Sequence, residues 1–179
     1  MKRKPGTYAL ILRSHTKISV RVGKLGQLNT GPAYFIYIGS AFGPGGVRAR
    51  VLRHFRQTKT KHWHIDYLRE FVTPVSAWYS HELVNLEHRW ARAFSEIDNA
   101  VAVKGFGCSD CTCFSHLFTT STMPDFKQYS DIVGAGLIAT ETPETIDMIM
   151  NYRKKAEDPE WWEQNIEGHE VKCSNVRKQ

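Results

Sequence analysis

Two short, almost unbroken apolar runs constrain the fold more than any other feature of this chain. They lie at residues 7–14 (TYALILRS) and residues 34–38 (YFIYI). A strand with one face in water alternates apolar and polar residues, so a continuous apolar run of this length is typical of a strand buried on both faces. The chain therefore needs other elements to cover both faces of a sheet.

After the second run the spacing of the apolar residues changes. Val47, Val51 and Phe55 recur at helical intervals, which predicts a helix. The patterns together predict an α+β fold with a small, mainly antiparallel central sheet flanked by helices and a partly helical C-terminal extension. The predicted elements are strands at residues 7–14, 18–22 (the hairpin partner of 7–14), 34–38, 75–79 and 101–103, and helices at residues 47–56, 65–71 and 82–95.

Charge is distributed unevenly along the chain. Residues 1–123 hold 17 Lys and Arg against 7 Asp and Glu, a net charge of +10, whereas residues 124–179 hold 7 against 11, a net charge of −4. We therefore predict a domain at residues 1–123 and an acidic extension at residues 124–179 with one helix at residues 142–156. The first acidic residue is Asp66, and so long a basic stretch indicates an anionic partner, nucleic acid before an anionic membrane surface.

The hydropathy of the chain predicts no membrane-spanning helix. No segment has the long uncharged run that a membrane-spanning helix needs, and the first five residues, MKRKP, lack the apolar stretch of a signal peptide. We expect a cytoplasmic protein that is nucleoid-associated when it is bound to DNA.

One carboxylate falls on the apolar side of the helix predicted at residues 82–95. On a helical wheel Glu87 lies between Ala91 and Phe94. An isolated buried carboxylate costs several kcal/mol, so Glu87 needs a cation, a network of donors or a metal. Pairing with a core arginine and binding of a metal are both open. The wheel assigns to the apolar side Leu83, Leu86, Trp90, Ala91 and Phe94.

The helix predicted at residues 47–56 carries basic residues on two sides. Arg50 and His54 are four residues apart and project together at the edge of the apolar stripe, where they can reach a site. Arg53 and Arg56 point away, toward solvent or distant phosphates. The predicted nucleic-acid-binding residues are Arg53, Arg56, Lys59, Lys61 and His62.

Several of these residues belong to an ordered set of motifs. The set resembles the GIY-YIG nuclease superfamily, and in particular a little-characterised branch that is sometimes fused to endonuclease III-type DNA glycosylases. The similarity spans roughly residues 4–120. Its motifs are Gly6-Thr7-Tyr8, Tyr37-Ile38-Gly39-Ser40-Ala41, Gly43-Pro44-Gly45-Gly46, Arg50-Val51-Leu52-Arg53-His54-Phe55, HWHIDYL at residues 62–68 and GFGCSDCTCFSHL at residues 105–117.

The resemblance implies a phosphodiesterase that uses one divalent ion, Mg²⁺ or Mn²⁺. It makes Tyr8 and Tyr37 the paired tyrosines, Arg50 the arginine, His54 the histidine one turn later and Glu87 the metal ligand. A phenol is a poor base at neutral pH, so Tyr8 needs a cation or His54 beside it before it can relay a proton.

Three further groups keep two interpretations each. Glu82 is a second candidate for the metal ligand. His62 and His64 either assist catalysis or form a structural corner with Trp63 and Ile65, and residues 43–46 either bind phosphate or turn the chain.

Three of the four cysteines are crowded into one segment. Cys108, Cys111 and Cys113 are followed by His116, a set of ligand types suited to zinc, although the spacing is tighter than in paired-hairpin zinc sites. The family resemblance also explains this segment without a metal.

Three functions follow from these patterns. The first is a metal-dependent endonuclease that acts on DNA, with branched or damaged structures as candidate substrates. The second is a nucleic-acid-binding module that does not cut, favoured because the superfamily's usual late asparagine has no clear match. The third is a zinc-dependent interaction protein.

Overall fold

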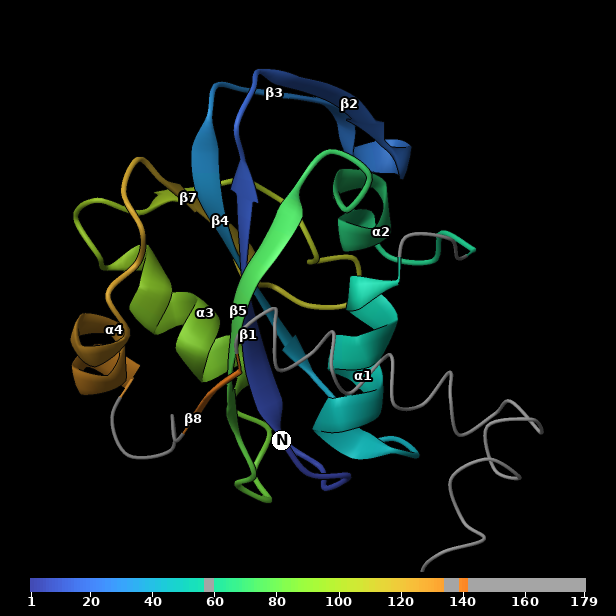
Figure 1. Ribbon diagram of the computed structural model, residues 1–179, viewed down its shortest axis with the longest axis vertical. Helices are drawn as coiled ribbons and strands as arrows, with labels where there is room; N and C mark the ends of the chain where they lie inside the picture. Colours follow the sequence, from blue (N-terminus) through green and yellow to red (C-terminus); the bar gives the residue numbers. More distant parts are fainter. Residues whose placement is uncertain (57–59, 134–138, 142–179) are drawn as a thin grey trace, which may run out of the picture. The chain divides into compact units, whose positions relative to one another are not determined.

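The computed structural model describes residues 1–56, 60–133 and 139–141, and its centre is a single antiparallel sheet (Figure 1). The strand order is β6-β7-β4-β1-β5-β8, so that β1 lies inside the sheet between β4 and β5. Every pairing between neighbouring strands is antiparallel, which confirms the predicted fold class. The strands are β1 (Thr7–Ser14), β4 (Ala33–Ser40), β5 (Thr73–Ser80), β6 (Val101–Ala102), β7 (Leu117–Thr120) and β8 (Ala139–Glu141).

A second, smaller sheet differs from the prediction. β2 (Ile18–Val22) has the predicted bounds, but it pairs with β3 (Gly26–Thr30) and not with β1, so the predicted hairpin is wrong. The reason is a tight turn at Gly23–Leu25 that joins β2 directly to β3. Gly23 in the turn and Gly26 just after it adopt positive φ angles of 46° and 96°, which favour glycine. β1 pairs instead with β4 and β5.

Helices cover both faces of the main sheet, as the apolar runs require (Figure 1). α1 (Gly46–Phe55) and α2 (His64–Leu68) lie on one side, and α3 (Glu87–Ser95) and α4 (Phe126–Val133) on the other. Successive side chains of a strand point to opposite faces. In β1, Ala9 and Ile11 thus join the core under α3 and α4, whereas Tyr8 faces α1.

The core under α3 and α4 is built around large aromatic side chains. Trp78 of β5, Trp90 and Phe94 of α3 and Tyr129 of α4 are each at most 1% exposed. Truncation of a buried Trp or Phe to Ala costs about 3–5 kcal/mol, so this packing holds α3 firmly on the sheet. The first residue of α3, Glu87, is positioned by that packing.

α3 begins five residues later than predicted. The helix starts at Glu87 rather than at Glu82, and the side chains of Leu83 and Val84 are exposed, so the placement of Leu83 on an apolar helix face is wrong. The wheel assumed a continuous helix through this segment. In the structure Asn85 accepts a hydrogen bond from the N–H of Glu87, a local turn that competes with helix before this point.

The compact unit runs further along the chain than residue 123. It comprises Met1–Pro143, and the remaining residues, Glu144–Gln179, form a separate unit. α4 belongs to the first unit because Tyr129 and Val133 are buried in its core. The helix predicted at residues 142–156 lies outside the described residues.

Candidate functional site

The paired tyrosines face each other across neighbouring strands. Tyr8 on β1 lies opposite Gly39 on β4, two residues beyond Tyr37, and the two phenol rings have centroids 6.5 Å apart. Gly39 makes this arrangement possible, since a Cβ atom at its position would lie 2.5 Å from the hydroxyl oxygen of Tyr8. The glycine of the Tyr37-Ile38-Gly39 motif thus provides space for a ring.

α1 adds a histidine to the two tyrosines. His54 is 1% exposed, and its Nε2 forms a 2.8 Å hydrogen bond with the hydroxyl of Tyr8. Its ring centroid lies 5.7 Å from that of Tyr8 and 5.8 Å from that of Tyr37. We call Tyr8, Tyr37 and His54 the aromatic site.

Burial determines the protonation of the aromatic site. It raises the pKa of Tyr8 well above its ordinary value, and Tyr37 adds to that rise while the charge of Arg50 opposes it. Burial also raises the pKa of Tyr37, with the charge of Glu87 as the next cause. Both phenols are therefore protonated at neutral pH, and each responds to the charges of Arg50 and Glu87.

Arg50 is held at this site by an aromatic ring. Its guanidinium lies 4.3 Å from the centroid of Trp63, while Arg53 lies 4.2 Å from the same ring. The ring of Trp63 is in turn 5.8 Å from that of His54. These stacked cations border a hollow of about 250 Å³, which is lined by Ala41, Gly43, Pro44, Gly46, Ala49, Arg50, Arg53 and Trp63.

The helix position of Arg53 predicts a solvent-exposed side chain, but in the structure this side chain also has a structural role. It donates hydrogen bonds of 3.1–3.2 Å to the buried carboxylate of Asp66, which also accepts from the backbone N–H groups of His62 and Trp63. Asp66 thereby joins the C-terminal half of α1 to the start of α2.

The other predicted nucleic-acid contacts vary in their surroundings. The side chains of Arg56, Lys61 and His62 are exposed, and Lys61 forms a 2.7 Å ion pair with Glu70. Lys59 lies outside the described residues.

Glu87 is partly buried at the start of α3 and uses both of its carboxylate oxygens. Oε1 accepts a hydrogen bond of 2.9 Å from Nδ1 of His116, and Oε2 accepts a short one from the hydroxyl of Ser40. Burial alone would raise the pKa of Glu87, but the hydrogen bonds from His116 and Ser40 outweigh it and lower that pKa. Glu87 is therefore an anion at neutral pH, whereas Glu82 is exposed outside the helix.

His64 has a structural environment. Its Nδ1 accepts a 3.0 Å hydrogen bond from the N–H of Gly107, and its ring packs edge-on against Phe106 at 5.5 Å. Burial lowers the pKa of His64, so the ring is neutral at pH 7. Of the two interpretations, these contacts favour the packed corner.

The glycine-rich turn before α1 also favours its structural interpretation. The N–H groups at the start of α1 are engaged by backbone carbonyls: Gly46 donates to Gly43, Val47 to Lys4 and Arg48 to Lys2. Gly46 has a φ of 57°, and a Cβ atom there would lie 2.1 Å from the carbonyl oxygen of Lys4. The turn thus docks the N-terminal residues against α1.

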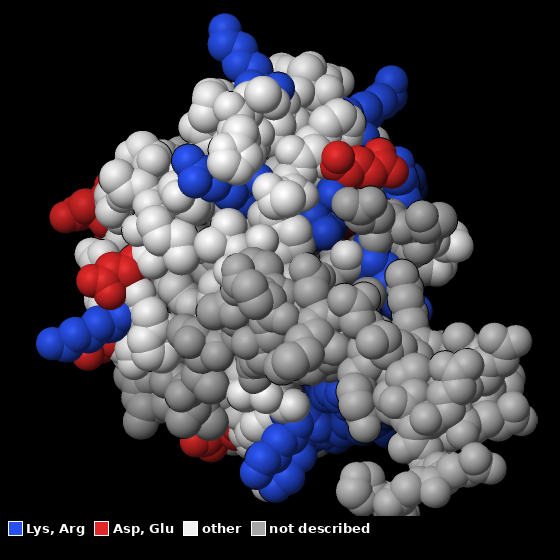
Figure 2. All heavy atoms as spheres, viewed as in Figure 1, with Lys and Arg blue, Asp and Glu red and all other residues white. Residues whose placement is uncertain are grey.

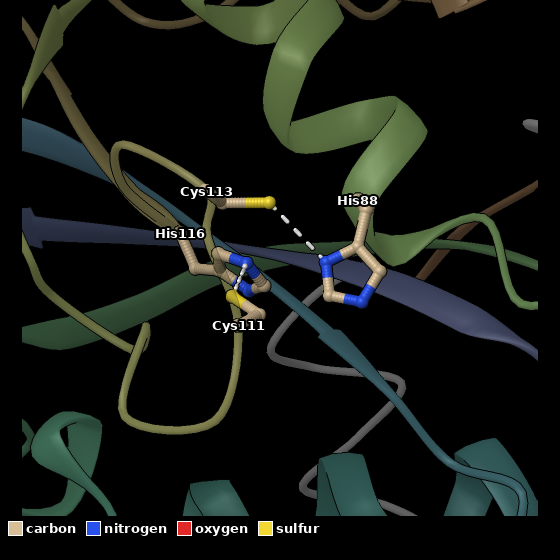
Figure 3. Close-up of side chains that lie close together, drawn as sticks. All are labelled: His88, Cys111, Cys113 and His116. Atoms are coloured by element: carbon tan, nitrogen blue, oxygen red, sulfur yellow. Dashed lines mark hydrogen bonds between the residues drawn. The ribbon is translucent and has the colours of Figure 1, made fainter.

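Four nitrogen and sulfur ligands gather beside Glu87, and they differ from the predicted set. His88 of α3 and three residues of the loop before β7, Cys111, Cys113 and His116, have ligand atoms that all lie within 4.8 Å of one another (Figure 3). We call these four residues the thiol–imidazole cluster. Cys108 is not among them; its sulfur lies 3.4 Å from the carbonyl oxygen of Phe106 and also interacts with Cys111.

The sequence does not predict four contacts of the site residues. They are the contacts made by Ser40, Trp63, His88 and His116. Ser40 follows the Tyr37-Ile38-Gly39 motif, and His88 follows Glu87, so adjacency to a predicted residue was the available signal. The sequence predicts His116 only as a candidate zinc ligand.

Charge on the molecular surface follows the arrangement of the helices. In the view of Figure 2, acidic side chains lie mainly on the side of α3 and α4, and basic side chains lie mainly around α1, α2 and the β2–β3 hairpin. Among the described ranges of the chain, no helix has the length and apolar character required to cross a bilayer.

Comparison with known proteins assigns a family but no activity. Residues 7–137 match the family model described as "Domain of unknown function DUF123". No curated protein and no solved structure matches the chain. The match covers most of the sequence, including every residue of the aromatic site and of the thiol–imidazole cluster. The chain is therefore a member of the family of the domain of unknown function DUF123.

Proposed function

We propose that this protein is a divalent-metal-dependent endonuclease that hydrolyses phosphodiester bonds in DNA. The observation that supports the proposal most is the aromatic site, in which two phenols and an imidazole from three elements meet and the phenols feel the charges of Arg50 and Glu87. The resemblance of its residues to the GIY-YIG motifs and the basic surface around α1 support the same assignment.

In this proposal Tyr8 and His54 form a proton relay. The pKa of Tyr8 is raised by burial, so Tyr8 cannot act as a base unless another group takes its proton. Nε2 of His54, 2.8 Å away, is placed to accept that proton while the Tyr8 oxygen accepts one from an attacking water. Tyr37 orients the water or the phosphate from the neighbouring strand.

Arg50 stabilises the charge that builds up on phosphate. Its planar guanidinium is suited to two parallel hydrogen bonds with phosphate oxygens, and its stacking on Trp63 reduces the number of side-chain conformations it must give up. The hollow that Arg50 and Arg53 border gives a phosphate access to this cation.

Glu87 is the residue proposed to hold Mg²⁺ or Mn²⁺. Its carboxylate is anionic and partly exposed, and each oxygen retains a lone pair beyond those used by His116 and Ser40. Magnesium accepts one or two carboxylate oxygens and keeps several waters, so a single glutamate fits it, whereas thiolates do not. When bound, the ion would supply Lewis-acid stabilisation of the leaving oxygen.

The test is a nicking assay on supercoiled DNA with Mg²⁺ or Mn²⁺. Wild type is expected to nick, and Arg50→Ala to lose about 100-fold or more of that rate while staying folded, because it removes a transition-state contact. Arg48→Ala on the same helix is the matched control and should retain activity, since among the described residues Arg48 interacts only through its backbone N–H, which donates to Lys2. Glu87→Gln should behave like Arg50→Ala, and full activity in both variants would reject the site.

A second candidate is a nucleic-acid-binding module that does not cut. It is favoured by the fact that both oxygens of Glu87 already accept hydrogen bonds from protein groups. Under both candidates DNA affinity should fall steeply as salt rises, because bound phosphates release counterions. Salt-sensitive binding without nicking of any DNA form would select the module.

A further inference from the structure

The thiol–imidazole cluster has the dimensions of a metal site. Nδ1 of His88 lies 3.2 Å from the sulfur of Cys113, and Nε2 of His116 lies 3.4 Å from the sulfur of Cys111. Ligands of a tetrahedral zinc ion, at roughly 2.0–2.3 Å from the metal, stand roughly 3.3–3.8 Å from one another. The four ligand atoms all lie within 4.8 Å of one another, so small side-chain rotations are sufficient to complete a tetrahedron.

The side chains also point in the required directions. Figure 3 shows the ring of His88 facing the sulfur of Cys113 and the ring of His116 beside the sulfur of Cys111, with His88 coming from α3 and the other three from the loop that precedes β7. His116 is buried, Cys111 and Cys113 are half-buried and His88 is exposed. A metal placed here would have protein ligands on all four sides and lie near the surface.

The ligand chemistry selects one class of metal. Two thiolates with two imidazoles suit zinc, and hard ions such as Mg²⁺ prefer oxygen ligands. Four protein ligands leave no open position for water or substrate, and this closed set is typical of structural rather than catalytic zinc.

Glu87 provides the outer support that zinc-bound histidines usually have. A carboxylate oxygen only accepts hydrogen bonds, so Nδ1 of His116 carries the proton that it donates to Glu87 at 2.9 Å. This leaves Nε2, on the side of Cys111, to bind the metal. A histidine ligand commonly donates its second N–H to a carboxylate, which fixes the ring and its tautomer.

We propose that His88, Cys111, Cys113 and His116 bind one structural zinc ion, which ties α3 to the loop between β6 and β7 and fixes His116 against Glu87. The ion is distinct from the Mg²⁺ or Mn²⁺ proposed for cleavage, and the inference does not depend on nuclease activity. If both proposals hold, the zinc ion orients Glu87 through the hydrogen bond that Glu87 accepts from His116.

The experiment measures metal by mass spectrometry in the full-length chain, purified without chelators. Wild type should carry about one zinc per chain, and Cys111→Ser and Cys113→Ser should carry less than about one-tenth of that, because each loses a thiolate ligand. Cys108→Ser is the matched control from the same loop. It should keep most of the zinc, because all four ligands remain and the serine hydroxyl can still donate to the Phe106 carbonyl, although the contact of Cys108 with Cys111 is changed.

Two further measurements keep the result decisive if the cysteine variants do not fold. His88→Gln changes an exposed ligand, and it should fold and lose most of the zinc. Cobalt added to metal-free wild type should produce a thiolate-to-cobalt absorption band that Cys111→Ser lacks and Cys108→Ser retains. Absence of zinc from wild type together with absence of the cobalt band would overturn the proposal, as would full zinc content in His88→Gln and both cysteine variants.

Failure of this proposal is distinguishable from failure of the nuclease proposal. Arg50→Ala should contain as much zinc as wild type, because Arg50 is not a ligand and lies against Trp63. A chain that contains zinc and does not nick DNA would support the site and reject cleavage. A chain that nicks DNA with no zinc would do the reverse.

Discussion

The aromatic site and the thiol–imidazole cluster are held in place by different forces. Tyr8, Tyr37 and His54 come from two central strands and a packed helix, are at most 8% exposed, and have their positions determined by the core. The cluster takes three of its four residues from a loop, and His88 is exposed. Packing therefore preorganises the first region, whereas the second would be fixed by the zinc ion that we propose.

Removal of zinc should have the largest effect and should separate the two regions. A chelator is expected to lower the free energy of unfolding by about 4 kcal/mol, the contribution of a ligand present at about 1,000 times its Kd. Hydrogen exchange should then accelerate in the loop that contains Cys111 and Cys113, while the amides of β1 and β4 stay protected. Cys111→Ser should show no further change with chelator, and equal acceleration in β1 would contradict the comparison.

The second largest loss of stability is expected from removing the hydrogen bonds between Asp66 and Arg53. Asp66→Asn removes the buried charge that binds Arg53 and should destabilise the protein by about 3 kcal/mol in denaturant unfolding. The zinc content should not change. The control is Lys61→Ala, which breaks an ion pair between two exposed side chains and should cost less than about 1 kcal/mol. Equal losses of unfolding free energy in the two variants would show that Asp66 stabilises the protein no more than an exposed ion pair does.

Tyr8→Phe tests the chemistry of the aromatic site with little change in packing. It removes one hydroxyl and the hydrogen bond to His54, so nicking should fall about 100-fold, the lower range for loss of a proton-transfer group. Tyr34→Phe, on the neighbouring strand β4, is the control and should remain active, because Tyr34 pairs with Arg13 at the other end of β1 from Tyr8. An unchanged rate in Tyr8→Phe would exclude the proposed relay.

The smallest effect is expected at the alternative carboxylate. Glu82 is exposed and precedes α3, so Glu82→Gln should change the free energy of unfolding by less than about 0.5 kcal/mol and leave the nicking rate and zinc content unchanged. A loss of activity comparable to that in Glu87→Gln would transfer the metal-ligand role to Glu82.

The sequence predicts several strands and helix α1 well because the pattern of apolar residues that indicates them is local. The bounds of β1 and β2 agree with the structure, and α1 and β5 are found within two residues. β3 is missed because Gly26–Thr30 contains one apolar side chain, Leu28, among turn-forming residues. The pairing of β2 with β3 rather than β1 is a choice between partners, which periodicity does not determine.

The two candidate sites also differ in how far local sequence patterns predict them. The helical spacing of Arg50 and His54 predicts that they project together, and both lie beside Trp63 in the structure. The ligands of the cluster come from separate elements, so spacing within one loop selects Cys108 where the fold places His88. Tertiary contacts between separate elements leave no signal in the local sequence pattern.

The position of β1 inside the sheet has a consequence for biosynthesis. β1 leaves the ribosome before both of the strands that flank it, which are β4, ending at Ser40, and β5, ending at Ser80. Until residue 80 emerges, an apolar strand has at least one unpaired edge, and such edges are prone to intermolecular pairing. Translation that stalls before that residue would therefore expose the nascent chain to aggregation, whereas a later pause would not leave this edge open.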